Sequence, residues 1–294
     1  MNTNGIFLML LSMATFAVAD TLIKICGSYL TPAQIMFFLI SGGLLLFGMI
    51  TLVQGENLNE PRAFVPILLL RYCTEVIGLV GMVMALTYVP LSTVGAITQA
   101  SPILVAVGAV FFLKETISWR RWSSIGFGFL GVVLVIQPGA ESMDLAVVWP
   151  VLTLVAFSVR DLITRLTPPD IASASLATYT MVFALPCAIA WVLFNGDNFF
   201  PAGVNWTLVV IMVVLGSLGY LLLIASLRVG ELSAVMPFRY SRIVFLLVLG
   251  VLVFDERPSA SMLVGASLII VSGVYIMLRE RVLKRRRSQE KVDA

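Results

Sequence analysis

The chain has 294 residues, of which 60% are hydrophobic and only 12% are charged, with a formal net charge of +3. A soluble domain usually carries about a quarter charged residues, so a mean hydropathy of +1.02 excludes an ordinary soluble fold and requires lipid to cover much of the surface. Most of the small positive charge lies in the C-terminal tail, which excludes a nucleic-acid partner because such a protein needs a basic face.

Apolar segments of membrane-spanning length follow one another along the whole chain, and a bilayer crossing needs about 20 such residues. In chain order we predict spans over residues 4–26, 31–53, 64–86, 91–113, 121–138, 146–166, 172–194, 206–227, 232–254 and 261–280. Turn residues such as Pro138-Gly139 and Pro168-Pro169 separate them. The predicted fold is therefore an all-α membrane protein with ten transmembrane helices.

The basic residues of the short connections orient these spans. If the N-terminus is cytoplasmic, nearly all connecting lysines and arginines lie inside and only Arg257 lies outside. Cytoplasmic loops carry an excess of lysine and arginine, so we predict this orientation. An even number of spans then places both termini in the cytoplasm, with residues 281–294 as a basic cytoplasmic tail.

The two halves of the chain resemble each other at a spacing of 141 residues, as between Phe16 and Phe157. At this spacing Phe16, Val18, Asp20 and Lys24 align with Phe157, Val159, Asp161 and Arg165, and Glu115 aligns with Glu256. We therefore predict two repeats, over residues 1–140 and 141–280. Five spans in each repeat invert the second relative to the first, an architecture of secondary transporters. A duplication that serves only stability is the alternative.

The most specific stretches are Leu86 to Pro102, Phe112 to Glu115, and the echo of the latter in Val253 to Glu256. With them the chain resembles the drug/metabolite transporter superfamily, in particular its EamA family and the bacterial amino-acid and metabolite exporters of the YddG type. The resemblance implies a 5+5 inverted repeat, alternating access in the bacterial inner membrane, a small-molecule substrate and no cofactor. Related members move S-adenosylmethionine, riboflavin, sugars or drugs, so the resemblance does not decide the substrate.

Charged residues inside the spans are the first group of candidate site residues, because charge at membrane depth is costly and usually functional. Asp20 and Lys24 are four residues apart, as are Arg71 and Glu75, so each pair shares a helix face. The gate or ion-pair candidates are Asp20, Lys24, Arg71, Arg160, Asp161 and Arg165. Two interpretations remain open for them, a structural pair or gate and direct contact with substrate.

A second group of residues is predicted to line a central cavity. We expect Glu75 to approach Arg239 or Arg242, where a zwitterionic amino acid would find complementary charges; a purely structural ion pair is the alternative. Gln99 and Tyr240 align at the repeat spacing beside proline kinks, and we expect both to face the cavity unless they only join helices. The full set is Phe16, Tyr72, Glu75, Met82, Gln99, Phe157, Arg239, Tyr240 and Arg242.

Catalytic and nucleotide-binding motifs are missing from the sequence, which has no histidine and no Walker loop. We therefore predict a non-enzymatic secondary transporter of small metabolites, with amino-acid export by alternating access as the expected function. The alternatives are another cargo, such as S-adenosylmethionine, riboflavin, a nucleotide-like compound or a drug, and a membrane scaffold that transports nothing. The sequence predicts no metal site, and the oligomeric state is left open between monomer and homodimer.

Overall fold

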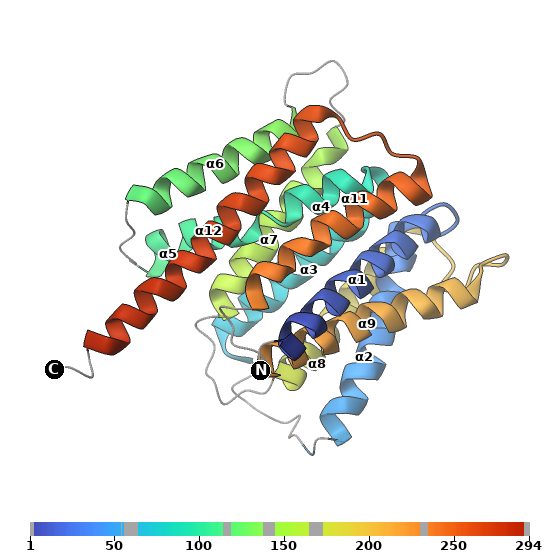
Figure 1. Ribbon diagram of the computed structural model, residues 1–294. Coiled ribbons are helices and arrows are strands. Elements are labelled where there is room, and N and C mark those ends of the chain that lie inside the picture. Colours follow the sequence, from blue (N-terminus) through green and yellow to red (C-terminus); the bar gives the residue numbers. More distant parts are fainter. Residues whose placement is uncertain are drawn as a thin grey trace.

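A computed structural model describes residues 3–53, 55, 64–113, 119–137, 145–164, 173–229 and 235–290. Throughout these residues the chain folds into helices and connecting turns, and no strand occurs in them. Figure 1 shows long helices lying side by side with their axes roughly aligned, and it places the two chain termini at the same end of the bundle. The predicted all-α class is therefore confirmed.

The helices follow the predicted apolar segments closely. They are α1 (Thr3–Cys26), α2 (Pro32–Val53), α3 (Pro66–Tyr88), α4 (Leu91–Thr98), α5 (Ser101–Leu113), α6 (Trp119–Ile136), α7 (Val148–Thr164), α8 (Ser173–Asn195), α9 (Trp206–Val229), α11 (Ser241–Phe254) and α12 (Ala260–Glu290), with short 3₁₀ turns η2 (Leu145–Val147) and η3 (Met236–Tyr240). Eight described segments are long and apolar enough to cross a membrane. The fifth and tenth predicted spans fall on α6 and α12, whose apolar parts, Trp122–Ile136 and Ala260–Tyr275, are shorter.

Two of the predicted spans are not continuous α-helices. The segment predicted over 91–113 breaks at Gln99 and Ala100, between α4 and α5. Pro102 follows at the second position of α5 and has no N–H to donate to the preceding turn, which explains a break at this point. The described part of the segment predicted over 232–254 begins with the 3₁₀ turn η3, which contains Pro237, before α11. Both breaks fall within segments that are long and apolar enough to cross a membrane.

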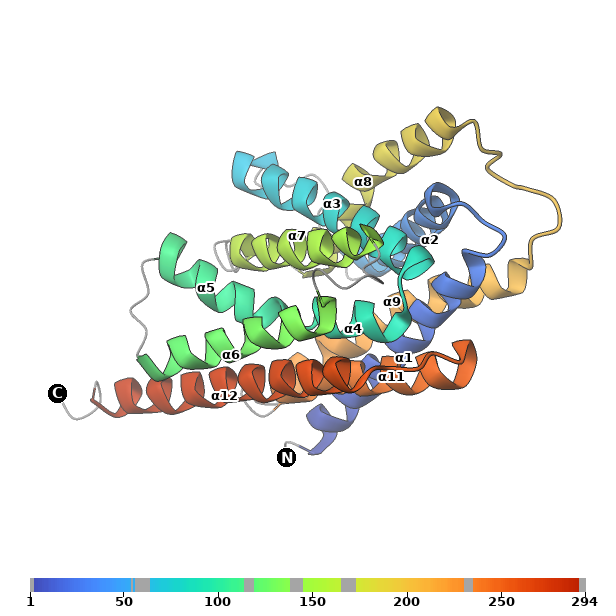
Figure 2. The ribbon, with the colours of Figure 1, turned by 90° about the horizontal axis from the view of Figure 1, so that it is seen from above.

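Glycines bring the helices of each neighbouring pair close together. The most extensive contacts join α1 to α9, α3 to α7, α2 to α8 and α6 to α12. The ring of Phe16 on α1 rests on Gly219 of α9, and the ring of Phe157 on α7 rests on Gly78 of α3. Figure 2 shows α6 and α12 running alongside each other at one edge of the bundle, opposite α2 and α8. Small residues at these contacts favour the close packing that associates helices in lipid.

Candidate functional site

A network of charged side chains joins α3 to α7 in the interior of the bundle. Nη1 of Arg160 donates to Oε1 of Glu75 at 2.7 Å, and Nη2 and Nε of Arg160 both donate to Oδ1 of Asp161, at 2.8 and 2.9 Å. Arg71 on α3 completes the network, with 3.7 Å between its Nη2 and Oε2 of Glu75. Arg160 thus holds two carboxylates at once, which is the use for which its forked donors are suited.

Arg71 also anchors the network to the neighbouring helices. Its Nε donates to the hydroxyl of Thr164 on α7 at 3.0 Å, and its Nη1 donates to the hydroxyl of Thr180 on α8 at 2.9 Å. The side chain is buried and its donors face three different helices. Arg71 therefore has the contacts of a residue that fixes the helices in place.

A second ion pair joins α1 to α11. Nη2 and Nε of Arg242 donate to Oδ2 of Asp20 at 2.5 and 3.1 Å. The Asp20 side chain is only 6% exposed, so the pair is largely shielded from water. The Arg242 guanidinium lies 5.1 Å from the centroid of the Phe16 ring, and that of Arg160 lies 4.4 Å from the centroid of Phe157. Both candidate phenylalanines therefore contact an arginine of the charged interior.

Arg239 on η3 carries a further charge near both groups, and Tyr220 on α9 lies near the first of them. Arg239 is within electrostatic range of Asp161, Arg160 and Arg242. Tyr220 is within range of Asp161 and Arg160 and also of Glu75 and Arg71. Charges from α1, α3, α7 and α11 therefore converge with η3 and α9 on one region inside the bundle. We call the side chains of Asp20, Arg71, Glu75, Arg160, Asp161, Arg239 and Arg242 the charged interior.

Gln99 connects the break between α4 and α5 to this region. Its Nε2 donates to the backbone carbonyl of Arg239 at 2.7 Å. The bond satisfies a carbonyl of the irregular turn η3, which an α-helix would otherwise have satisfied. Gln99 thereby fixes the backbone that carries the Arg239 side chain.

Two predicted pairings are wrong. Asp20 does not pair with Lys24: Arg242 reaches Asp20 from α11, while Nζ of Lys24 donates to the carbonyl of Val89 at 2.7 Å. Glu75 meets neither Arg239 nor Arg242, because α7 packs directly on α3 and delivers Arg160 to it. The predicted residues do carry the charged interior, but in other combinations. Arg165 lies outside the described residues.

Three predicted cavity residues belong to apolar clusters instead. Tyr240 is 3% exposed and packs against Gly273 of α12, so the expectation that it faces a cavity is wrong. Tyr72 is buried beside Phe183, and Met82 packs against the main apolar cluster, to which α1, α2 and α3 contribute together with α4, α8, α9 and α11. Tyr240 packs there because Gly273 of α12 has no side chain and leaves space for the tyrosine ring.

Sequence reasoning missed Tyr220 and the hydroxyls of Thr164 and Thr180. A single tyrosine among the leucines and valines of α9 could have been singled out as the one aromatic hydroxyl of that span. The two threonines carry no comparable signal, because threonine side chains often bond only to their own helix backbone, as both also do here.

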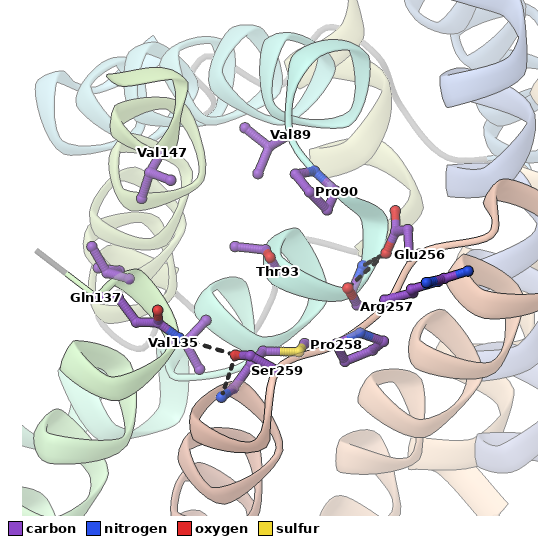
Figure 3. A pocket seen from close by; sticks show the side chains of 13 residues that line it. Val89, Pro90, Thr93, Val135, Gln137, Val147, Glu256, Arg257, Pro258 and Ser259 are labelled. Carbon is purple, nitrogen blue, oxygen red and sulfur yellow. Dashed lines mark hydrogen bonds between the residues drawn. The ribbon is translucent and has the colours of Figure 1, made fainter. Parts of the chain in front are cut away.

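A separate pocket of about 310 Å³ lies at the end of the bundle where α3, α6 and α11 end and α4 and α12 begin (Figure 3). Val89, Pro90 and Thr93 line one part of the pocket. The connection Glu256–Ser259 and Gln137 line another part. The Glu256 carboxylate accepts hydrogen bonds from the N–H groups of Leu91 and Ser92 at 2.5 and 3.0 Å, and from the Ser92 hydroxyl at 2.6 Å. A residue after α11 thus caps the N-terminus of α4, where a negative charge is favoured.

Local backbone geometry positions this glutamate. Asp255 ends α11 in a left-handed conformation with φ of 52°, and the N–H of Glu256 donates to the carbonyl of Gly250 at 3.1 Å. A Cβ on Gly250 would lie 2.5 Å from Oε2 of Glu256. The missing side chain at Gly250 therefore leaves the room that the glutamate needs to turn back toward α4.

Helices long and apolar enough to cross a membrane, with charged side chains paired between them, define a multi-pass membrane protein, and comparison with known proteins identifies its class. The EamA-like transporter family matches the chain twice, over residues 3–137 and 144–279. The S-adenosylmethionine uptake transporter of Rickettsia felis is 28% identical over 94% of this chain and 93% of its own. The pseudopaline exporter of Pseudomonas aeruginosa is 28% identical over 93% and 95%, and the riboflavin transporter of Brucella anthropi 25% identical over 72% and 76%.

A solved crystal structure covers 94% of this chain and 97% of its own, with a TM-score of 0.64 and 19% identity, and shows the same fold. The chain belongs to the EamA-like transporter family. It is a transporter of small metabolites, and the resemblance read from its sequence is confirmed. The expected setting, the bacterial inner membrane, agrees with the family and with the bacterial origin of these relatives.

Proposed function

We propose that this transporter moves metabolites that carry an amino-acid head group. The observation that carries the proposal is the charged interior, in which positive arginines and negative carboxylates converge between helices long and apolar enough to cross a membrane. A group that is both ammonium and carboxylate can exchange bonds with such a network, whereas an uncharged cargo would leave it unchanged. Amino-acid export, expected from the sequence, is one form of this function, and movement of S-adenosylmethionine is another, in line with the named relatives.

We further propose that the chain crosses the membrane ten times as a 5+5 inverted repeat with both termini cytoplasmic, and works by alternating access. Support comes from the double match to the family, from two termini at one end of the bundle, and from helix bounds that recur at the spacing of 141. Helices α1 and α7 correspond at this spacing, as do α3 and α9, and the contact of α1 with α9 mirrors that of α7 with α3. Substrate sites in such repeats lie between the two halves.

Counterflow in liposomes tests the proposed function. Purified protein is reconstituted, loaded with unlabelled substrate, and assayed for uptake of labelled amino acids and labelled S-adenosylmethionine, with and without a pH gradient. Saturable uptake that depends on the protein is expected for at least one of these compounds. Labelled riboflavin is assayed in parallel: flux of riboflavin alone would contradict the head-group proposal, and the absence of flux for every compound would favour a scaffold. Loading inside-out and right-side-out vesicles separately would give the direction.

A further inference from the structure

The charged interior contains one more cation than its carboxylates can pair. Arg242 is paired with Asp20, Arg160 with Glu75 and Asp161, and Arg71 with Glu75. No ion pair joins Arg239 to a carboxylate anywhere in the described part of the chain. The three acidic residues of this network are all occupied by other arginines, so Arg239 is the unmatched charge of the set.

The position of Arg239 makes its unpaired charge unfavourable for stability and favourable for binding an anionic ligand. It lies in η3 at the start of a membrane-spanning segment, half-buried, with Arg160 and Arg242 both within electrostatic range. A buried charge without a counterion is strongly unfavourable, and neighbouring cations add to the cost. Its backbone is nevertheless held in place by Gln99. An anionic group brought in by a ligand would relieve this repulsion and meet a prepositioned guanidinium.

Asp161 offers the complementary half of such a site. Both of its bonds from Arg160 fall on Oδ1, and Oδ2 accepts no hydrogen bond from the described residues. Its side chain is 31% exposed, against 13% for Glu75 and 6% for Asp20. It is also the carboxylate within electrostatic range of Arg239. Oδ1 of Asp20 likewise accepts no hydrogen bond from the described residues, so the greater exposure of Asp161 is what sets it apart and gives a ligand access to its second oxygen.

From this geometry we propose that Arg239 binds the carboxylate of the transported substrate and Asp161 its ammonium. The inference rests on the proposed function and adds the two residues that would recognise the head group. Arg239 matches a carboxylate because its two parallel N–H donors fit the two carboxylate oxygens. A substrate stripped of its carboxylate would keep the contact with Asp161 and lose the contact with Arg239, so the two contacts can be separated by choice of ligand.

Competition measurements with three ligands test this assignment. The inhibition of counterflow is measured with an amino acid that the wild type transports, with the matching amine that lacks the carboxylate, and with the matching acid that lacks the ammonium. Arg239→Gln is expected to weaken inhibition by the amino acid and by the acid about 10- to 100-fold, the range of a lost charged hydrogen bond. Inhibition by the amine should change little. Asp161→Asn should show the opposite preference, with the amine weakened and the acid spared.

Controls separate this inference from a loss of folding. Arg257→Gln removes an arginine of the separate pocket at the end of the bundle, away from the charged interior, and should leave all three inhibition constants unchanged. If Arg239→Gln does not fold, Arg239→Lys keeps the charge and should still show a smaller loss confined to carboxylate-bearing ligands. Equal losses for ligands with and without a carboxylate would overturn the inference alone. A wild type that binds and moves no such ligand would overturn the proposed function and this inference with it.

Discussion

Helices α1 and α7 hold the same aspartate at the same place of the repeat, Asp20 and Asp161, yet the two carboxylates have different partners. Asp20 is buried, and its arginine comes from α11, distant in sequence. Asp161 is partly exposed, and its arginine is the preceding residue of the same helix, which it shares with Glu75. One aspartate therefore joins two helices, whereas the other belongs to a group whose members can change partners.

This difference shows how a duplicated helix can serve two purposes. A cross-helix pair fixes the distance between α1 and α11, and moving either helix would expose a charge. A pair within one helix fixes no distance between helices, and a shared arginine keeps one carboxylate when the other is taken by a ligand. We therefore interpret the side of α1 and α11 as a fixed part of the interior and Asp161 as the adaptable carboxylate of the other side, where Glu75 and Arg71 still join α3 to its neighbouring helices.

Neutralising the two aspartates should give the largest difference. Asp20→Asn leaves Arg242 buried without its counterion, so the free energy of unfolding should fall by about 3–5 kcal/mol. Asp161→Asn leaves Arg160 bonded to Glu75 at 2.7 Å and should cost no more than about 1 kcal/mol. Thermal unfolding of the detergent-solubilised variants measures both. Asp20→Asn combined with Arg242→Gln should recover part of the loss, and equal losses for the single variants would refute the division into fixed and adaptable sides.

The glycines under the two phenylalanines should give a smaller difference. A Cβ on Gly78 would overlap the Phe157 ring, whereas one on Gly219 would lie 3.0 Å from the Phe16 ring. Gly78→Ala should therefore cost about 1–3 kcal/mol, the usual range for overpacking, and Gly219→Ala less. The same unfolding assay checks the order. Gly216→Ala is the control, because a Cβ there meets nothing within 4 Å; a larger cost at Gly219 than at Gly78 would contradict the structure.

The cap by Glu256 should have the smallest effect of the three. Glu256→Gln removes the charge and one acceptor from the N-terminus of α4, which should cost about 0.5–2 kcal/mol. Hydrogen exchange should speed up at Leu91 and Ser92, whose N–H groups bond to the carboxylate, and not in α1. This would add the connection after α11 to the fixed side, because Glu256 is the second residue after that helix. Unchanged exchange in the first turn of α4 would show that the cap does not hold this helix.

Much of the fold could be predicted from the sequence, because apolar runs of membrane length determine helices almost by themselves. The first predicted span, 4–26, and the helix Thr3–Cys26 differ by one residue at the start. Pro102 predicts a kink in the segment over 91–113, whereas the structure ends α4 before Gln99 and begins a new helix after it. The positions of the helices along the chain could therefore be predicted, because a helix depends on hydrogen bonds between neighbouring residues.

The pairing of the charges could not be predicted in the same way. Spacing of four residues favoured Lys24 as the partner of Asp20, since that rule sees only neighbours on one helix. The actual partner, Arg242, depends on which helices pack together, and apolar segments of similar composition do not specify this. Gln99 and Tyr240 illustrate the same limit: they align in the repeat, but Gly273 exists opposite only one of them.

The contact between α6 and α12 has a mechanical consequence. At Gly131 and Gly265 each backbone carbonyl would touch a Cβ added to the other residue, at 2.7 and 2.6 Å, so main chain rests on main chain. Side chains of Leu268 and Ile269 on α12 and of Leu134 and Val135 on α6 lie beside the same point, so both helices close around the glycine contact. A methyl group at either glycine would push α6 and α12 apart, so the closure of this edge of the bundle depends on two positions that carry no side chain.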